Sequence, residues 1–185
     1  MLLLCGKSCS GKNVIQKEIV RMGMEPIVTY TTRPPREGET DGIEYHFVDK
    51  NNFLEKDRQG FFAETAHYDV ATGDRWYYGS AIGDLGDNKV IIVDPCRLKQ
   101  LKRMISLNPI SVYITAGEAT IWSRLRERGD RVDEARRRLN ADDFDFLGIE
   151  KEVDFSFSND LGLKPEVLAE MIMYTYNKVI GGKTN

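Results

Sequence analysis

Short runs of apolar, mostly branched residues alternate along the chain with segments in which apolar residues recur at helical spacing. Each apolar run is followed by a turn signal or a polar segment, which predicts a buried strand. The five runs lie at residues 1–5, 27–31, 90–94, 110–115 and 153–158. Strands that alternate with helices are typical of a parallel sheet covered by helices, so we predict an α/β fold.

Three further segments predict amphipathic helices, because their apolar residues fall on one face. The first covers residues 12–22, the second begins near residue 98, and Pro165 opens the third. Their apolar faces consist of Ile15, Ile19 and Met22 in the first, Leu98, Leu101, Met104 and Ile105 in the second, and Val167, Leu168, Met171 and Ile172 in the third. These helices supply the layers that cover the predicted sheet.

Two stretches break the alternation. Residues 32–83 are rich in Gly, Pro, Tyr, Phe and charge, and the alternating residues 45–48 suit a small antiparallel strand, so we expect an insertion on the core. Between residues 124 and 138, seven arginines stand against four acidic residues in a chain whose net charge is −3. This local reversal of sign predicts an anionic ligand.

Length and composition limit the class of protein. The 185 residues fit one domain, and 30% charged with 41% hydrophobic residues is typical of a globular protein without the basic excess of a nucleic-acid binder. Residues 1–5 are far shorter than a membrane span or a signal-peptide core, so we expect a cytoplasmic protein with no membrane partner. Cys5, Cys9 and Cys96 cannot all pair and lack zinc-type spacing, so neither a disulfide framework nor a structural metal is expected.

The first predicted strand leads directly into Gly6-Lys7-Ser8-Cys9-Ser10-Gly11-Lys12-Asn13, and a helix follows. In such a loop, backbone N–H groups surround phosphate oxygens, the helix N-terminus adds a favourable dipole, and the lysine reaches the β and γ phosphates. We therefore expect Gly6, Ser8, Cys9, Ser10, Gly11, Lys12 and Asn13 to bind ATP. Asn13 stands where a Ser or Thr hydroxyl usually binds Mg²⁺, and its amide oxygen is also a hard ligand. The alternative is a glycine turn that binds nothing.

A second phosphate site is indicated by Arg33-Pro34-Pro35-Arg36. The prolines restrict the backbone between the two arginines, so two guanidinium groups are held at a set separation. Taken alone, the same residues also fit a solvated basic loop.

Together with the phosphate loop, this segment resembles the guanylate kinase family, whose motif has the form Thr-Thr-Arg-x-Pro-Arg-x-Gly-Glu-x-x-Gly-x-x-Tyr-x-Phe. Every fixed position of that form is present at residues 31–47. The resemblance continues through residues 61–64, 77–80, the strand ending at Asp94, the arginine-rich stretch and residues 158–160, and so spans nearly the whole chain. It implies a P-loop kinase fold in one domain, residues 1–185. The core would be residues 1–31, 84–123 and 140–185, with a small mixed nucleotide-binding insertion at 32–83 and a helical lid at 124–139.

The resemblance implies transfer of the γ-phosphoryl group of ATP to GMP or dGMP, with Mg²⁺ as cofactor. By similarity, Arg33, Arg36, Tyr45 and Tyr78 would hold the GMP phosphate, and Thr29, Glu64 and Ser80 would bind guanine. Arg124, Arg128 and Arg138 would close over the donor phosphates, and Asn159 would lie beside adenine. Asp94, at the acceptor side, would hold Mg²⁺ through water together with Asn13. Lys12, Arg33 and the three lid arginines would be the catalytic residues.

The chemistry of the bases agrees with the role given to Glu64. Guanine presents N1–H and its 2-amino group side by side, and one carboxylate can accept from both, whereas adenine has an acceptor at N1. The other interpretation of Glu64 is a surface carboxylate in a loop. Because the attacking group is already a phosphate oxygen, no strong general base is needed, and we expect His46 and His67 to be structural or exposed.

Three features depart from the family pattern and keep alternatives open. Cys9 replaces a glycine of the family, Asn13 replaces the metal-binding hydroxyl, and residues 67–75 form a longer connection than usual, which could reshape the acceptor pocket. One alternative is therefore a kinase for another or a modified nucleotide. The other is a non-catalytic module that grips a phosphopeptide, although such a module needs neither Lys12 nor the lid arginines.

Overall fold

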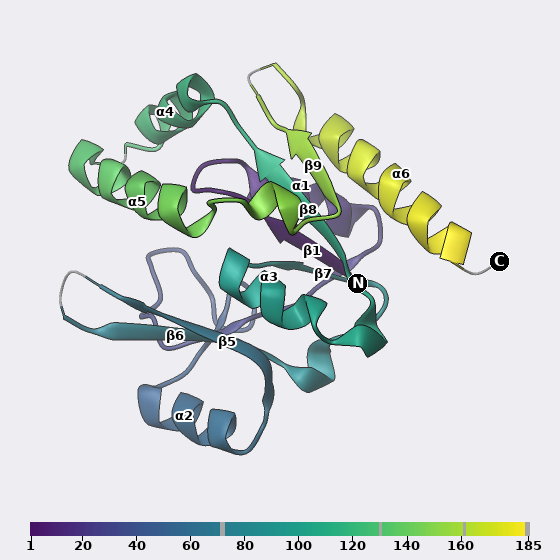
Figure 1. Cartoon of the computed structure of the whole chain (residues 1–185). Coiled ribbons are helices and arrows are strands. Elements are labelled where there is room, and N and C mark those ends of the chain that lie inside the picture. Colours follow the sequence, from purple (N-terminus) through teal and green to yellow (C-terminus); the bar gives the residue numbers. More distant parts are fainter. Residues whose placement is uncertain (71–72, 130, 161, 184–185) are drawn as a thin grey trace.

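The core of the protein is a five-stranded parallel sheet, as the pattern predicts (Figure 1). The computed structural model describes residues 1–70, 73–129, 131–160 and 162–183. The strand order is β2-β7-β1-β8-β9. The bounds are Leu2–Cys5 for β1, Glu25–Pro26 for β2, Lys89–Ile92 for β7, Ile110–Thr115 for β8 and Phe155–Ser158 for β9. Ile110–Thr115 agrees with the prediction to the residue, and the other strands of the central sheet except β2 differ from it by one to a few residues.

The central strands are mostly apolar because helices cover both faces of this sheet. Leu2 and Leu4 of β1 pack on the side of α1 (Lys12–Arg21) and α6 (Pro165–Lys183). Leu3 and Cys5 point to the other side, where α3 (Pro95–Lys102) lies. The three predicted helices are these three, although α3 ends at Lys102 and a separate 3₁₀ turn, Ile105–Leu107, follows it.

The predicted strand at residues 27–31 is wrong, because only its last two residues form a strand and that strand belongs to the second sheet. Glu25–Pro26 forms β2 at the edge of the central sheet, whereas Tyr30–Thr31 forms β3 in a second, four-stranded sheet. Both ends of the run are shielded from water, since Ile27 and Thr31 are buried in different layers. The pattern of residues 27–31 therefore does not reveal that the chain passes from one sheet to the other here.

The second sheet has the order β4-β3-β6-β5 and lies below the core in Figure 1, with α2 (Lys50–Arg58) on its outer side. Its strands are His46–Phe47 for β4, Phe62–Asp69 for β5 and Arg75–Ala81 for β6. β5 and β6 form an antiparallel hairpin, and the longer connection noted at residues 67–75 is the end of that hairpin, where Arg75 Nε contacts Asp69 Oδ1 at 2.6 Å. Ala71 and Thr72 lie outside the described residues. The strand expected near residues 45–48 exists, but it pairs with β3 in parallel and not antiparallel, because a long loop returns the chain in the same direction.

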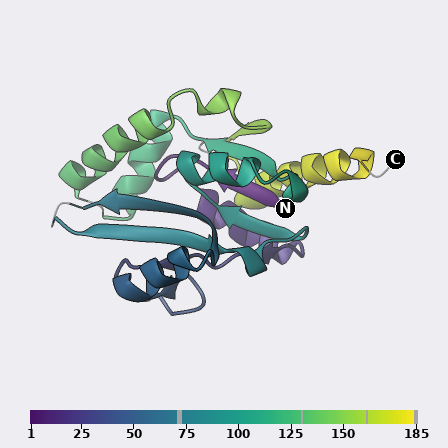
Figure 2. The same cartoon turned by 60° about the horizontal axis from the view of Figure 1, so that its bottom comes forward.

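The arginine-rich stretch forms two helices, α4 (Glu118–Glu127) and α5 (Val132–Asp145). They lie next to each other above the small sheet in both views (Figures 1 and 2). Two further 3₁₀ turns, Ile82–Asp84 and Ile149–Lys151, complete the described elements. None of the helices in the described part of the chain is long and apolar enough to cross a membrane.

A polar cluster lies at the end of the central sheet that is away from the phosphate loop. The buried Ser111 of β8 donates its backbone N–H and its hydroxyl to Asp154 Oδ2, at 2.8 and 2.5 Å. Lys102 Nζ lies 3.3 Å from the same carboxylate. Burial raises the pKa of Asp154, but the hydrogen bonds from Ser111 and the charge of Lys102 outweigh it and hold the pKa below its ordinary value.

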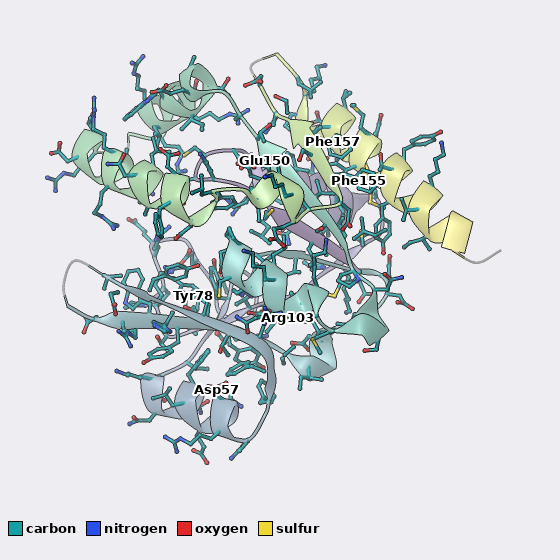
Figure 3. The ribbon with its side chains drawn as sticks, in the orientation of Figure 1. Asp57, Tyr78, Arg103, Glu150, Phe155 and Phe157 are labelled. Carbon is teal, nitrogen blue, oxygen red and sulfur yellow. The ribbon has the colours of Figure 1, made fainter. Side chains whose placement is uncertain are left out.

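We expect Asp154→Ala to lower the free energy of unfolding by about 1–3 kcal/mol, because it leaves buried donors of Ser111 without an acceptor. Asp57→Ala is the control, since Asp57 is exposed on α2 (Figure 3), and a change within about 0.5 kcal/mol is expected there. Urea unfolding measures both. The contribution of Asp154 is present above its unfolded pKa and disappears as the pH falls through the lower folded pKa, so the difference between wild type and variant should shrink in acid. Equal losses in both variants would contradict the assignment.

Candidate active site

The loop between β1 and α1 is shaped for an anion and is supported from behind. Gly11 has φ +92°, and a Cβ built there would lie 2.2 Å from Asn159 Nδ2. The buried Asn159 donates from Nδ2 to the carbonyl oxygen of Ser10 at 2.7 Å. Arg124 of α4 donates to the carbonyl oxygens of Cys9 and Asn159, at 3.1 and 2.9 Å. These contacts fix the carbonyl groups of the loop.

Lys12 begins α1, and its ammonium group folds back over the loop, where Nζ donates to the carbonyl oxygen of Lys7 at 3.0 Å. Burial lowers the pKa of Lys12 below its ordinary value, against the opposing effect of Asp142. Lys12 and the neighbouring Asn13 line a cavity of about 650 Å³. The cation assigned to the donor phosphates is thus placed at the wall of the largest cavity described.

Cys9, which replaces a glycine of the resembled family, keeps the backbone conformation that favours glycine. Its φ is +60°, in the left-handed region. Its sulfur lies 3.2 Å from Nη1 of Arg128, one of the expected lid arginines. Arg138, another of them, lies on α5 and is partly exposed. Arg124 and Arg128 therefore contact the loop itself, while Arg138 approaches from the second lid helix.

Two carboxylates of α5, which sequence reasoning missed, also reach this loop. The backbone N–H of Ser8 donates to Asp142 Oδ2 at 2.6 Å, and Lys7 Nζ lies 2.6 Å from Asp143 Oδ1. Ser8 N–H belongs to the set assigned to phosphate oxygens. A carboxylate oxygen of the protein therefore occupies a position that the donor phosphate would need.

The acceptor side is built on β3, β6 and the loop after β3. The buried Arg33 directs Nη2 to both carboxylate oxygens of Glu39, each at 2.8 Å, and its Cζ lies 5.1 Å from the ring centre of Tyr45. The rings of Tyr45 and Tyr78 are 6.1 Å apart. Figure 3 shows Tyr78 on the side of the small sheet that faces the core, away from Asp57 of α2. Arg36 is exposed at the mouth of the same cavity.

One cavity brings two of the predicted donor residues together with five of the predicted acceptor residues. Its walls include Lys12, Asn13, Thr29, Arg33, Arg36, Tyr45 and Tyr78. Glu64 and Ser80 are not among its described lining residues, because Arg97 of α3 lies in front of them. Arg97, also missed by the sequence reasoning, donates to Glu64 Oε2 from Nε at 2.5 Å and to Glu64 Oε1 from Nη2 at 2.7 Å.

Asp94, predicted at the end of a strand, lies just beyond β7 and caps α3. Its Oδ1 accepts from the backbone N–H of Arg97 at 3.0 Å. Burial, the negative charge of Asp94 and a hydrogen bond with it raise the pKa of Tyr68. Asp94 is therefore tied to α3 and to the β5–β6 hairpin, and it does not line the cavity described above. The expected structural role of His46 is consistent with its ring, which lies 4.5 Å from that of Tyr30.

Comparisons with known proteins agree with one another. The family profile described as Guanylate kinase matches residues 1–159. A guanylate kinase of Oleidesulfovibrio alaskensis is 33% identical over 150 residues, which cover 75% of this chain and 69% of that protein. A guanylate kinase of Wolinella succinogenes is 29% identical over 97% of this chain and 90% of its own. The crystal structure of guanylate kinase from Anaplasma phagocytophilum has a TM-score of 0.67 at 24% identity and covers 93% of this chain and 81% of that one.

We expect Asp142→Asn to strengthen ATP binding by roughly 3- to 10-fold, because it removes a negative charge that competes with phosphate for the N–H of Ser8. Equilibrium binding of ATP measures the effect. Asp133→Asn is the matched control, since Asp133 is exposed in the first turn of the same helix. Unchanged or weaker binding to Asp142→Asn would show that this carboxylate does not compete with the nucleotide.

Proposed function

The chain belongs to the guanylate kinase family, and on that premise we propose that it transfers the γ-phosphoryl group of ATP to the phosphate of a nucleoside monophosphate. GMP and dGMP are the acceptors suggested by the names of its relatives. The observation that carries the proposal is the shared cavity. Lys12 of the donor loop and Arg33, Tyr45 and Tyr78 of the acceptor side line the same space of about 650 Å³.

The proposed reaction needs positioning and charge neutralisation more than acid–base chemistry. An oxygen of the acceptor phosphate forms a bond to the γ-phosphorus, and the bond to the β,γ-bridging oxygen breaks with its electron pair left on ADP. Lys12 stabilises the negative charge on the donor side, and Arg33 and Arg36 bind the acceptor phosphate. Binding of that phosphate requires Arg33 to exchange its contacts with Glu39 for contacts with phosphate oxygens.

The residues at the donor loop are compatible with a magnesium ion carried by ATP. Asn13 lines the cavity next to Lys12 and offers an amide oxygen, whereas the carboxylate of Asp94 caps α3 and does not line this cavity. Mg²⁺ takes few protein ligands when phosphates and water complete its coordination. When bound, the ion adds positive charge at the β and γ phosphates. Asn13 would hold the ion, and Asp94 would have to leave its position at the cap of α3 to take part.

A second candidate function is a kinase for a nucleotide other than GMP. The observation that favours it is the contact of Arg97 with Glu64, since Glu64 is the residue that would recognise guanine. A panel of GMP, dGMP, AMP, CMP and UMP in a coupled assay of ADP release decides between the two.

We expect Lys12→Ala to lower turnover at least about 100-fold, because it removes a positive charge that stabilises the transferring phosphoryl group. The affinity for the best acceptor of the panel should stay within about threefold, since Lys12 contacts the donor. Lys178→Ala, an exposed change on α6, is the control with normal turnover. Near-normal turnover of Lys12→Ala would mean that the loop is not the donor site.

A further inference from the structure

The three side chains that would recognise guanine are already hydrogen-bonded to one residue of the protein. Arg97 Nη2 lies 2.7 Å from Glu64 Oε1, 2.9 Å from Ser80 Oγ and 3.3 Å from Thr29 Oγ1. Arg97 Nε lies 2.5 Å from the other oxygen of Glu64. One guanidinium group therefore uses both oxygens of the carboxylate and both hydroxyls.

This guanidinium group presents the same donor pattern to Glu64 as guanine would. Guanine offers N1–H and a 2-amino N–H side by side, and Arg97 offers its Nε–H and an N–H of Nη2 side by side. The Glu64 side chain is 0% exposed and that of Arg97 is 6% exposed. Arg97 lines the cavity whereas Glu64 does not, so a ligand would meet the arginine first.

Electrostatic interactions of the guanidinium group and a backbone hydrogen bond together hold Arg97 in this position. Burial lowers the pKa of Arg97, but the charge of Glu64, its hydrogen bonds and the charge of Asp94 outweigh burial, so the pKa is raised and Arg97 remains a cation. Its backbone N–H is held by Asp94 in the first turn of α3. Moving the guanidinium away to admit guanine would leave the displaced cation without its partner and would give the buried carboxylate neutral donors in place of charged ones.

Arg97 retains one hydrogen-bond donor group that a ligand could use. Its Nη1 makes no hydrogen bond among the described residues, while Nε and Nη2 are used. The wall of the cavity at this point therefore presents N–H groups to a bound base, where the resembled family implies a carboxylate that accepts. A base edge with acceptor atoms fits that wall, and the donor edge of guanine does not.

We propose that Arg97 determines acceptor specificity: it withdraws Glu64 from the site and selects a nucleoside monophosphate whose base presents a carbonyl oxygen or ring nitrogen at this wall. The inference rests on the proposed phosphoryl transfer and names the class of its acceptor. GMP becomes a poor acceptor because its 2-amino group faces the N–H groups of Arg97.

Three nucleotides that differ only at C2 of a 6-oxopurine test this directly. GMP carries an amino group there, IMP a hydrogen atom and xanthosine monophosphate a carbonyl oxygen. We expect wild-type kcat/KM to be greatest for xanthosine monophosphate, intermediate for IMP and lowest for GMP, with a ratio of at least about tenfold between the extremes. In Arg97→Ala the freed carboxylate should reverse the order, with GMP favoured over xanthosine monophosphate by roughly 10- to 150-fold.

Two further variants guard against misfolding of Arg97→Ala, which leaves Glu64 buried without a partner. Arg97→Ala/Glu64→Gln removes both charges and should bring the ratio of the two nucleotides to within about threefold of one. Arg97→Lys retains a cation and should keep the wild-type order. Arg103→Ala is the control on the same helix, because Arg103 is exposed at the C-terminal end of α3 (Figure 3).

The outcomes separate this inference from the proposed function. If wild type already prefers GMP and Glu64→Gln abolishes that preference, the assignment of Arg97 is wrong and guanylate kinase activity stands. If no variant phosphorylates any nucleotide, phosphoryl transfer is wrong. In that case equilibrium binding of the same three nucleotides decides the role of Arg97: reversal of the order in Arg97→Ala supports it, and an unchanged order in that variant and in the double variant overturns it.

Discussion

The structure of the candidate site depends on the need to balance buried positive charge and N–H groups with carboxylates. A cation or an array of N–H groups turned into a half-buried site has a high free energy unless an anion faces it. Three carboxylates supply that anion: Glu39 at Arg33, Glu64 at Arg97, and Asp142 at the donor loop. The side chain of Glu39 remains 17% exposed and that of Glu64 is fully buried. The first pair can therefore exchange its partner for a ligand far more readily than the second.

The parts of the site that could be predicted are those encoded by neighbouring residues. The phosphate loop and residues 31–47 each form a continuous motif, and the family they indicate is confirmed. Arg97 and Asp142 were missed because their partners are remote in sequence: Arg97 contacts Glu64 33 positions away, and Asp142 contacts Ser8 134 positions away. Each lies on a helix surface, where arginine and aspartate are ordinary residues. Only the tertiary arrangement gives them a partner.

The fold could be predicted from the sequence wherever the apolar pattern fits only one kind of element. Burial on both faces predicts four strands of the central sheet, and burial on one face predicts the three helices. The pattern failed at residues 27–31, where the chain passes from the central sheet to the second sheet, and at β4, whose direction depends on how the preceding loop turns. Sequence periodicity indicates which residues are buried, but it does not indicate which other element covers them.

The helices α4 and α5 are each attached to the core by contacts of their own. The contacts of α4 involve backbone groups. The N–H of Gly117 donates to Asp160 at 2.6 Å, and Arg124 donates to the carbonyl oxygens of Cys9 and Asn159. The contacts of α5 are the hydrogen bond of Asp142 with Ser8 and the ion pair of Asp143 with Lys7. The side chain of Asp143 in that ion pair is 67% exposed. A phosphate that displaced Asp142 from Ser8 would release α5 and leave α4 attached to the core. The two helices would then move relative to each other about Gly129, where φ is +70°.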